Sequence, residues 1–160
     1  MTSTLREIGV KDFTFRVLSG VAIGIVVGLV PNAILGEIFK AFMHHHPFFG
    51  TLLHVVQAMQ FTVPALIGAL IALKFDMTPL AIAVVACASY VGSGAAQFKN
   101  GAWVIAGIGD LINTMITATI AVLFILLIEK RVGSMALIVY PTNVGGLSAT
   151  IGVLILPYVH

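Results

Sequence analysis

Long apolar runs, separated by short polar segments, constrain this chain more than any other feature. A helix needs roughly 20 apolar residues to cross about 30 Å of hydrocarbon. The sequence offers five such runs, at about 17–35, 48–73, 79–97, 102–128 and 134–158. Hydrophobic residues make up 59% of the chain and charged residues only 9%, a composition outside the range of soluble domains. We therefore predict an all-α, polytopic transmembrane helix bundle in which residues 1–160 form a single domain embedded in the lipid bilayer.

Glycine and proline predict where these helices break. The runs 48–73 and 102–128 exceed the length of a perpendicular span, so we expect each to tilt, break or include a re-entrant piece. Glycine permits unusual backbone angles and proline lacks an amide hydrogen. The alternative is that both residues are simply common in membrane helices. The expected breaks are Pro31, Pro64, Pro141, Gly92, Gly94 and the "GIGD" glycines Gly107 and Gly109.

The distribution of lysine and arginine predicts how the runs are oriented. Positive charge concentrates on the cytoplasmic side of membrane proteins. With the amino terminus inside, only Lys40 and Lys99 face outward. The remaining basic residues then lie inside, at Arg6, Lys11, Arg16, Lys74, Lys130 and Arg131. The sequence therefore predicts a cytoplasmic amino terminus.

The number of runs predicts half of a transporter. Five spans place the carboxyl terminus outside, where the sequence stops at "LPYVH". An odd number of helices is typical of one repeat of an inverted-repeat transporter, because the second repeat then begins on the opposite side. We see no repeat within the chain and expect the second copy in another chain or in a missing second half. The alternative is a complete small protein that forms a homodimer.

Polar residues inside the fourth run fall on one helical face. Asp110, Asn113, Thr114 and Thr117 are spaced i, i+3, i+4 and i+7. One hypothesis is that they bind a solute. The other is that the Asn and Thr side chains join helices while Asp110 caps the helix that begins after "GIG". Both can hold, and we expect first-turn amide hydrogens to bond the Asp110 carboxylate inside the bundle.

A second polar stripe lies on the run 48–73. Gln57 and Gln60 stand one turn apart, flanked by His54 and by Pro64, which frees the carbonyl of Gln60. Two amides offer donors and acceptors for a polyhydroxylated solute. The alternative is hydrogen bonding between helices at a kink. We expect the glutamines to lie opposite the stripe on the fourth run.

Further candidate binding residues adjoin the expected breaks. Ser93 and Gln97 follow the glycines of "YVGSGAAQ", Asn32 follows Pro31, and Asn143 lies in "YPTNVGG". Broken helices carry the binding groups of many transporters. The alternative for the small residues is a tight helix contact.

Several chemistries have no support in the sequence. The run "HHHP" lacks a spaced carboxylate or cysteine that would complete a metal site, so we expect no metal and no cofactor. No Ser-His-Asp or Cys-His arrangement supports hydrolysis, and no catalytic residue is predicted. The net charge is only +2 and no basic cluster exceeds "KR", which argues against nucleic acid.

Several segments carry a family resemblance, most specifically "GIGDLINTMI". The others are "RVLSGVAIGIVVGLVPNAILGE", "LLHVVQAMQFTVPALIGALIALKF", "YVGSGAAQ" and "LPYVH". Together the chain resembles the N-terminal half of phosphotransferase-system enzyme IIC-like permeases, a family that includes perfringolysin O regulator-like proteins. The resemblance implies a polytopic permease in the bacterial cytoplasmic (inner) membrane, with a sugar as its solute. It also implies soluble phosphocarrier proteins as partners, without which the chain transfers no phosphate.

Three functions are compatible with the sequence. A membrane permease subunit that binds and translocates a small polar solute explains the polar stripes and the broken helices. A membrane-embedded regulator or sensor would use the same residues to detect a metabolite. A structural helix bundle would use them only to join helices.

Overall fold

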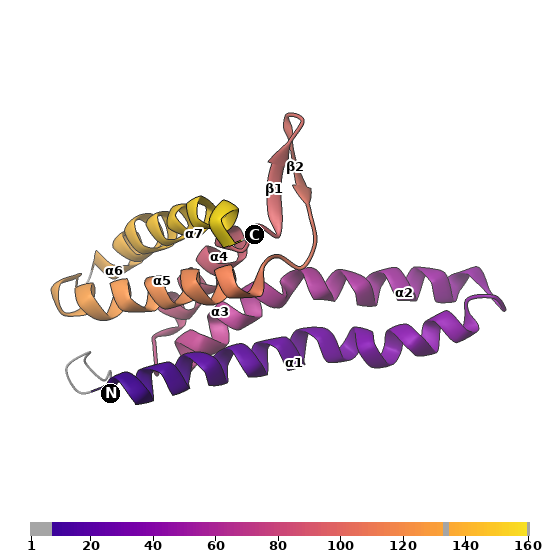
Figure 1. Cartoon of the computed structure of the whole chain (residues 1–160), viewed down its shortest axis with the longest axis horizontal. Helices are drawn as coiled ribbons and strands as arrows, with labels where there is room; N and C mark the ends of the chain where they lie inside the picture. The colour runs from indigo at the N-terminus through magenta and orange to yellow at the C-terminus, as the bar shows by residue number, and fades with distance from the viewer. Residues whose placement is uncertain (1–7, 133–134, 160) are drawn as a thin grey trace.

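The computed structural model describes residues 8–132 and 135–159. It is a bundle of helices with one small β-hairpin, which confirms the predicted all-α membrane architecture (Figure 1). Within the described residues, four stretches are long and apolar enough to span a membrane: Val10–Phe42, Pro47–Lys74, Leu111–Glu129 and Ala136–Ile155. The elements are α1 (Val10–Phe42), α2 (Pro47–Met59), the 3-10 turn η1 (Gln60–Thr62), α3 (Val63–Lys74), α4 (Pro79–Gly92), β1 (Ala96–Lys99), β2 (Ala102–Ile105), α5 (Leu111–Val132), α6 (Ala136–Val139), the π-helical segment η3 (Tyr140–Gly145) and α7 (Gly146–Val159).

Helix α1 packs along α3 through a row of small residues. Gly20, Gly24 and Gly28 recur every fourth residue and are buried. A Cβ on Gly20 would lie 2.7 Å from the Cα of Ile71, and a Cβ on Gly24 would lie 2.7 Å from Cγ1 of Ile67. Such spacing lets membrane helices approach closely. The expected break at Pro31 is absent, because α1 continues through it to Phe42.

The second predicted run folds as one long path with a local break. Helix α2 returns along α1, and η1 separates it from α3 (Figure 1). Pro64 is the second residue of α3 and cannot donate an amide hydrogen to Gln60. The chain therefore tightens into a 3-10 turn where the sequence predicted a break.

The third run is shorter than expected. Helix α4 begins where Thr78 Oγ1 accepts the amide hydrogen of Ala81 at 3.4 Å, and it ends at Gly92 instead of near residue 97. Its 14 residues measure about 21 Å, less than the thickness of the hydrocarbon core. Gly94, with φ of 74°, adopts the left-handed backbone and turns the chain out of the helix.

The start of the fourth run is a strand instead of a helix. β1 and β2 form an antiparallel hairpin in which Phe98 pairs with Trp103. The turn is Asn100–Gly101, with φ of 53° and 81°, as in the two-residue turns that favour Asn-Gly. Helix α5 therefore begins only at Leu111, after the "GIGD" break.

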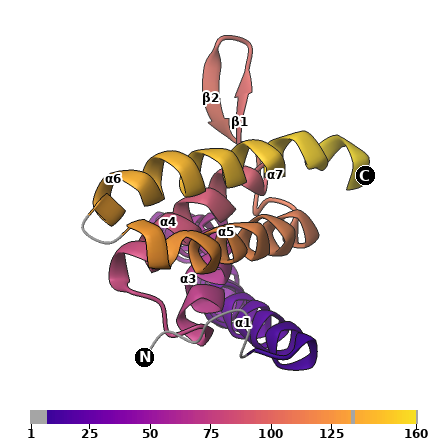
Figure 2. The same ribbon diagram turned by 90° about the vertical axis from the view of Figure 1, so that its left-hand side faces the viewer.

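The last run forms three joined segments, α6, η3 and α7. The π-helical segment η3 contains Pro141, which cannot donate the backbone hydrogen bond of a regular helix. Figure 2 shows α6 and α7 crossing over α4 and α5, with the hairpin projecting beyond them. The buried core lies chiefly on α3, α4 and α5, with Ile67, Ile71, Val85, Val122 and Ile125 among its members.

Candidate functional site

Asp110 stands at the amino end of α5 and joins it to the end of α4. Its Oδ1 accepts the amide hydrogen of Asn113 at 2.6 Å, so the expected cap is present. Its carbonyl accepts the amide hydrogen of Thr114 at 2.9 Å and the Thr114 hydroxyl at 2.6 Å. Its own amide donates to the carbonyl of Ser93 at 2.9 Å. One residue thus begins α5 and fixes it to the segment that follows α4.

The side chain of Asn113 links three helices. Its Nδ2 donates to the carbonyl of Gly92 at the end of α4 and, at 2.7 Å, to the carbonyl of Gly152 on α7. Thr117 lies one turn along α5, and a Cβ on Gly152 would lie 2.7 Å from the Cα of Gly92. We call Gly92, Asn113, Thr117 and Gly152 the three-helix crossing. Here the two glycines bring the backbones close enough for one amide to reach both carbonyls.

The polar stripe of α5 therefore faces neighbouring helices. Asn113, Thr114 and Thr117 are each 0% exposed. Among the described residues, Asn113 Oδ1 accepts no hydrogen bond, and Thr117 Oγ1 neither accepts nor donates one. The helix-joining interpretation explains the bonds of Asn113 Nδ2, while a role of these two oxygens in solute binding stays a prediction.

Beside the crossing lies a cavity of about 340 Å³, which we call the polar pocket. Ser93, Gly94 and Gln97 line it from the α4 side, and residues 106–110 line it from the α5 side, ending at Asp110. Gln97 Nε2 donates to the carbonyl of Gly94 at 3.0 Å. The two expected breaks meet here, because a Cβ on Gly109 would lie 2.8 Å from Cβ of Ser93. Gly109 also has a φ of 74° and Gly107 a φ of 151°.

The other predicted binding residues lie elsewhere. Gln57 and Gln60 are half-buried where α2 meets η1. Helix α2 packs along α1, and we call these two helices the arm (Figure 1). Asn32 is half-buried on α1, with its Oδ1 near Gly36. Asn143 is exposed in η3. None of the four lines the polar pocket, so the structure brings together Ser93, Gln97 and Asp110 and leaves these four apart.

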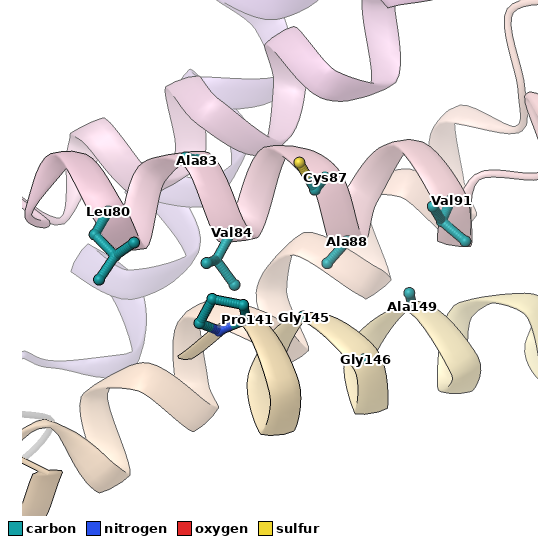
Figure 3. Close-up of a pocket in the computed structure, with 10 residues that line it drawn as sticks. All are labelled: Leu80, Ala83, Val84, Cys87, Ala88, Val91, Pro141, Gly145, Gly146 and Ala149. Carbon is teal, nitrogen blue, oxygen red and sulfur yellow. The ribbon is translucent and has the colours of Figure 1, made fainter. Parts of the chain in front are cut away.

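A larger groove of about 460 Å³ separates α4 from η3 and α7 (Figure 3). Val84 and Ala88 on α4 face Pro141 and Ala149 across it. Its remaining walls are alanine, glycine, leucine and valine, with Cys87 at one side. Such a surface offers a sugar hydroxyl no strong hydrogen-bond partner, so we do not place the solute here.

The histidine run has a local structural role. His46 Nδ1 accepts the amide hydrogen of Phe48 at 3.1 Å and caps α2. Within residues 8–132 and 135–159, no group of three or more His, Cys, Asp or Glu side chains is arranged to hold a metal ion.

The β-hairpin is the feature that the sequence analysis missed, although it positions Gln97. Its signal was the Asn-Gly pair between "AQFK" and "AWVI", because two short apolar stretches joined by Asn-Gly are typical of a hairpin. A continuous apolar run over the same residues suggested a helix instead.

Comparison with known proteins identifies the family. The sequence model described as "Phosphotransferase system, EIIC" matches residues 15–160. No curated protein and no solved structure matches the chain. The match covers most of the sequence and agrees with the apolar helices of the fold. The chain therefore belongs to the phosphotransferase-system EIIC family, the membrane permease components of sugar transport by that system.

Proposed function

We propose that this permease chain binds its sugar in the polar pocket, with Ser93, Gln97 and Asp110 as the contacting side chains. The observation that carries the proposal is the meeting of two broken helix ends around a polar cavity of about 340 Å³. Small-molecule sites commonly measure roughly 300–1,000 Å³. Transporters place their binding groups at such helix ends.

The chemistry of these side chains suits a polyhydroxylated solute. A carboxylate has two oxygens with roughly four lone-pair sites, and such oxygens accept hydrogen bonds from sugar hydroxyls. Gln97 carries an amide that both donates and accepts. The left-handed glycines keep the backbone of the pocket open to the solute.

The three-helix crossing supports this pocket in the proposal. Asn113 bonds the carbonyl of Gly92, directly before Ser93, and its backbone amide bonds Asp110. Its contribution to sugar binding is then to hold the two walls of the pocket together. Thr117 and the buried hydroxyl of Thr114 serve the same packing.

We further propose that the chain lies in the bacterial cytoplasmic membrane with its amino terminus inside. Arg16 Nη1 donates to the carbonyl of Lys74 at 2.8 Å, so these two basic residues lie at the same end of α1 and α3. Their proximity supports the topology deduced from charge. The chain then presents a sugar hydroxyl to a phosphorylated soluble partner, and its catalytic part is positioning.

Uptake by reconstituted vesicles tests the function. Vesicles that contain the chain receive a panel of radiolabelled sugars, with or without phosphocarrier proteins and phosphoenolpyruvate. We expect one sugar to accumulate as its phosphate only when the carriers are present. Sugar phosphate formed without carriers would contradict the proposal. If no sugar accumulates while one still raises the unfolding temperature, the sensor hypothesis replaces it.

A further inference from the structure

The lining of the polar pocket contains one ionisable side chain. It consists of Ser93, Gly94, Gln97 and residues 106–110, and of these only Asp110 carries an ionisable group. Asp110 is half-buried, so its carboxylate is partly withdrawn from water. Such a charge acts more strongly on a nearby solute than a charge on a fully exposed surface. Asp110 is therefore the residue through which the lining distinguishes a charged solute from an uncharged one.

The amino end of α5 would attract an anion if Asp110 were not there. A helix amino terminus carries about half a positive charge and unpaired amide hydrogens, and both favour a negatively charged group. In this chain the anion is part of the protein, because Asp110 Oδ1 accepts the amide hydrogen of Asn113 at 2.6 Å. The amide of Asp110 itself donates to the carbonyl of Ser93 at 2.9 Å. The carboxylate therefore takes the position that the phosphate or carboxylate of a solute would otherwise take.

A solute with a negative charge meets repulsion in this pocket, whereas an uncharged sugar does not. The other polar side chains of the lining, Ser93 and Gln97, are neutral. Two like unit charges about 6 Å apart, at an effective dielectric constant of about 20, repel each other strongly enough to weaken binding on the order of 100-fold. Unfavourable contacts of this kind are a common way to reject a wrong ligand.

We propose that Asp110 makes the polar pocket selective for uncharged sugars and excludes anionic ones, such as sugar acids and sugar phosphates. This inference rests on the proposed function, because it names the class of sugar that the same pocket takes. Asp110 is then a specificity-determining residue as well as the cap of α5.

The same selectivity favours release of the product. In the transfer, a sugar hydroxyl oxygen bonds the phosphorus of the partner's phosphoryl group, the partner leaves without that group, and the hydroxyl proton passes to water. A phosphate monoester carries a charge of about −1.5 to −2 at pH 7. The carboxylate that accepts the sugar as a neighbour therefore repels the sugar phosphate formed from it.

Pairs of ligands test the selectivity. The full chain is reconstituted in vesicles, and the affinity for each hexose and hexitol of a panel is compared with the affinity for its phosphate ester. For a sugar that binds, we expect the wild type to bind the phosphate ester roughly 100-fold more weakly. Asp110→Asn keeps one capping oxygen, and we expect it to reduce this ratio by about tenfold or more. Equal affinity of the wild type for a sugar and its phosphate ester would overturn the proposal.

Glu37→Gln is the matched control. It removes the same charge from an exposed side chain of α1 that does not line the polar pocket, so the ratio of affinities should stay that of the wild type. An equal change in Glu37→Gln and Asp110→Asn would show that the net charge of the chain determines the ratio, and would overturn the assignment to Asp110.

Salt provides a measurement that needs no variant. Because salt screens the repulsion between charges, the wild-type ratio should fall as sodium chloride is raised. A ratio that salt leaves unchanged would show that size excludes the phosphate ester, and would overturn the proposal. Failure of the proposed function gives a different result: no sugar binds, or Gln97→Ala leaves sugar affinity unchanged. Failure of this inference alone leaves sugar binding intact and removes only the discrimination against the phosphate ester.

Discussion

The three-helix crossing and the arm formed by α1 and α2 carry similar polar stripes but use them differently. At the crossing, Asn113 and Thr117 are fully buried between α4, α5 and α7. On the arm, Gln57 and Gln60 are only half-buried. Both pairs have helical spacing, so spacing alone identifies a shared face and does not say which neighbour covers it.

Small residues on the neighbouring helices explain why the polar side chains are buried and bonded at the crossing. Gly92 and Gly152 bring their carbonyls within reach of one amide at the crossing. Among the described residues, the side chains of Gln57 and Gln60 form no hydrogen bond that links two helices in this way. The comparison predicts that substitutions at the crossing reduce stability strongly and that substitutions on the arm do not.

The largest loss of stability is expected for Gly152→Ala. Its new Cβ would lie 2.7 Å from the Cα of Gly92, a backbone atom that cannot move without shifting α4. Overpacking typically costs about 1–3 kcal/mol and occasionally more. The unfolding temperature in detergent should fall clearly. Gly146→Ala is the control, because a Cβ there meets nothing within 4 Å; equal stability of the two variants would contradict the crossing.

The next effect is expected for Asn113→Ala. The side-chain amide would no longer donate to the carbonyls of Gly92 and Gly152, and the loss of two buried hydrogen bonds costs about 1–3 kcal/mol. Asn143→Ala, at an exposed position of η3, should change stability by less than about 0.5 kcal/mol. Chemical denaturation of both variants checks the difference. A loss at position 143 as large as that at position 113 would refute the assigned role.

A smaller effect is expected at the cap. Asp110→Ala removes the acceptor for the Asn113 amide, and the loss of such a cap costs about 0.5–2 kcal/mol. Asp110→Asn keeps one capping oxygen and should retain most of the stability. Thermal unfolding of the two variants separates these cases. An Ala variant as stable as the wild type would show that the cap does not stabilise the fold.

The smallest effect is expected on the arm. Gln57→Ala and Gln60→Ala change half-buried side chains away from the crossing and should alter stability by less than about 0.5 kcal/mol each. The same denaturation series provides the measurement. A loss comparable to that of Asn113→Ala would mean that the arm also depends on interhelical polar bonds.

The sequence predicted the parts of the fold that depend on local chemistry. Apolar length predicted the membrane helices, and the "GIGD" glycines with Asp110 predicted the break and the cap before α5. Each of these depends on residues that are neighbours in the chain. The Asn-Gly turn was equally local, but four apolar residues next to a helix resemble a continuation of it.

The sequence could not predict contacts between distant segments. Asn113 bonds Gly152, 39 residues away, and that partner depends on how α7 crosses α5. The expected position of the glutamines opposite Asn113 failed for the same reason, because α2 follows α1 (Figure 1). The polar pocket likewise arises where the chain after α4 returns to meet the start of α5.

The affinity for the transported sugar shows whether the polar pocket or the arm binds the solute. Equilibrium binding is measured for the wild type, Gln97→Ala and Gln57→Ala, after thermal unfolding has shown that the three proteins unfold at the same temperature. Loss of one hydrogen bond to the sugar costs about 1–1.5 kcal/mol, so Gln97→Ala should weaken binding about tenfold, while Gln57→Ala leaves it unchanged. Weakened binding in Gln57→Ala together with unchanged binding in Gln97→Ala would place the sugar on the arm and not in the polar pocket.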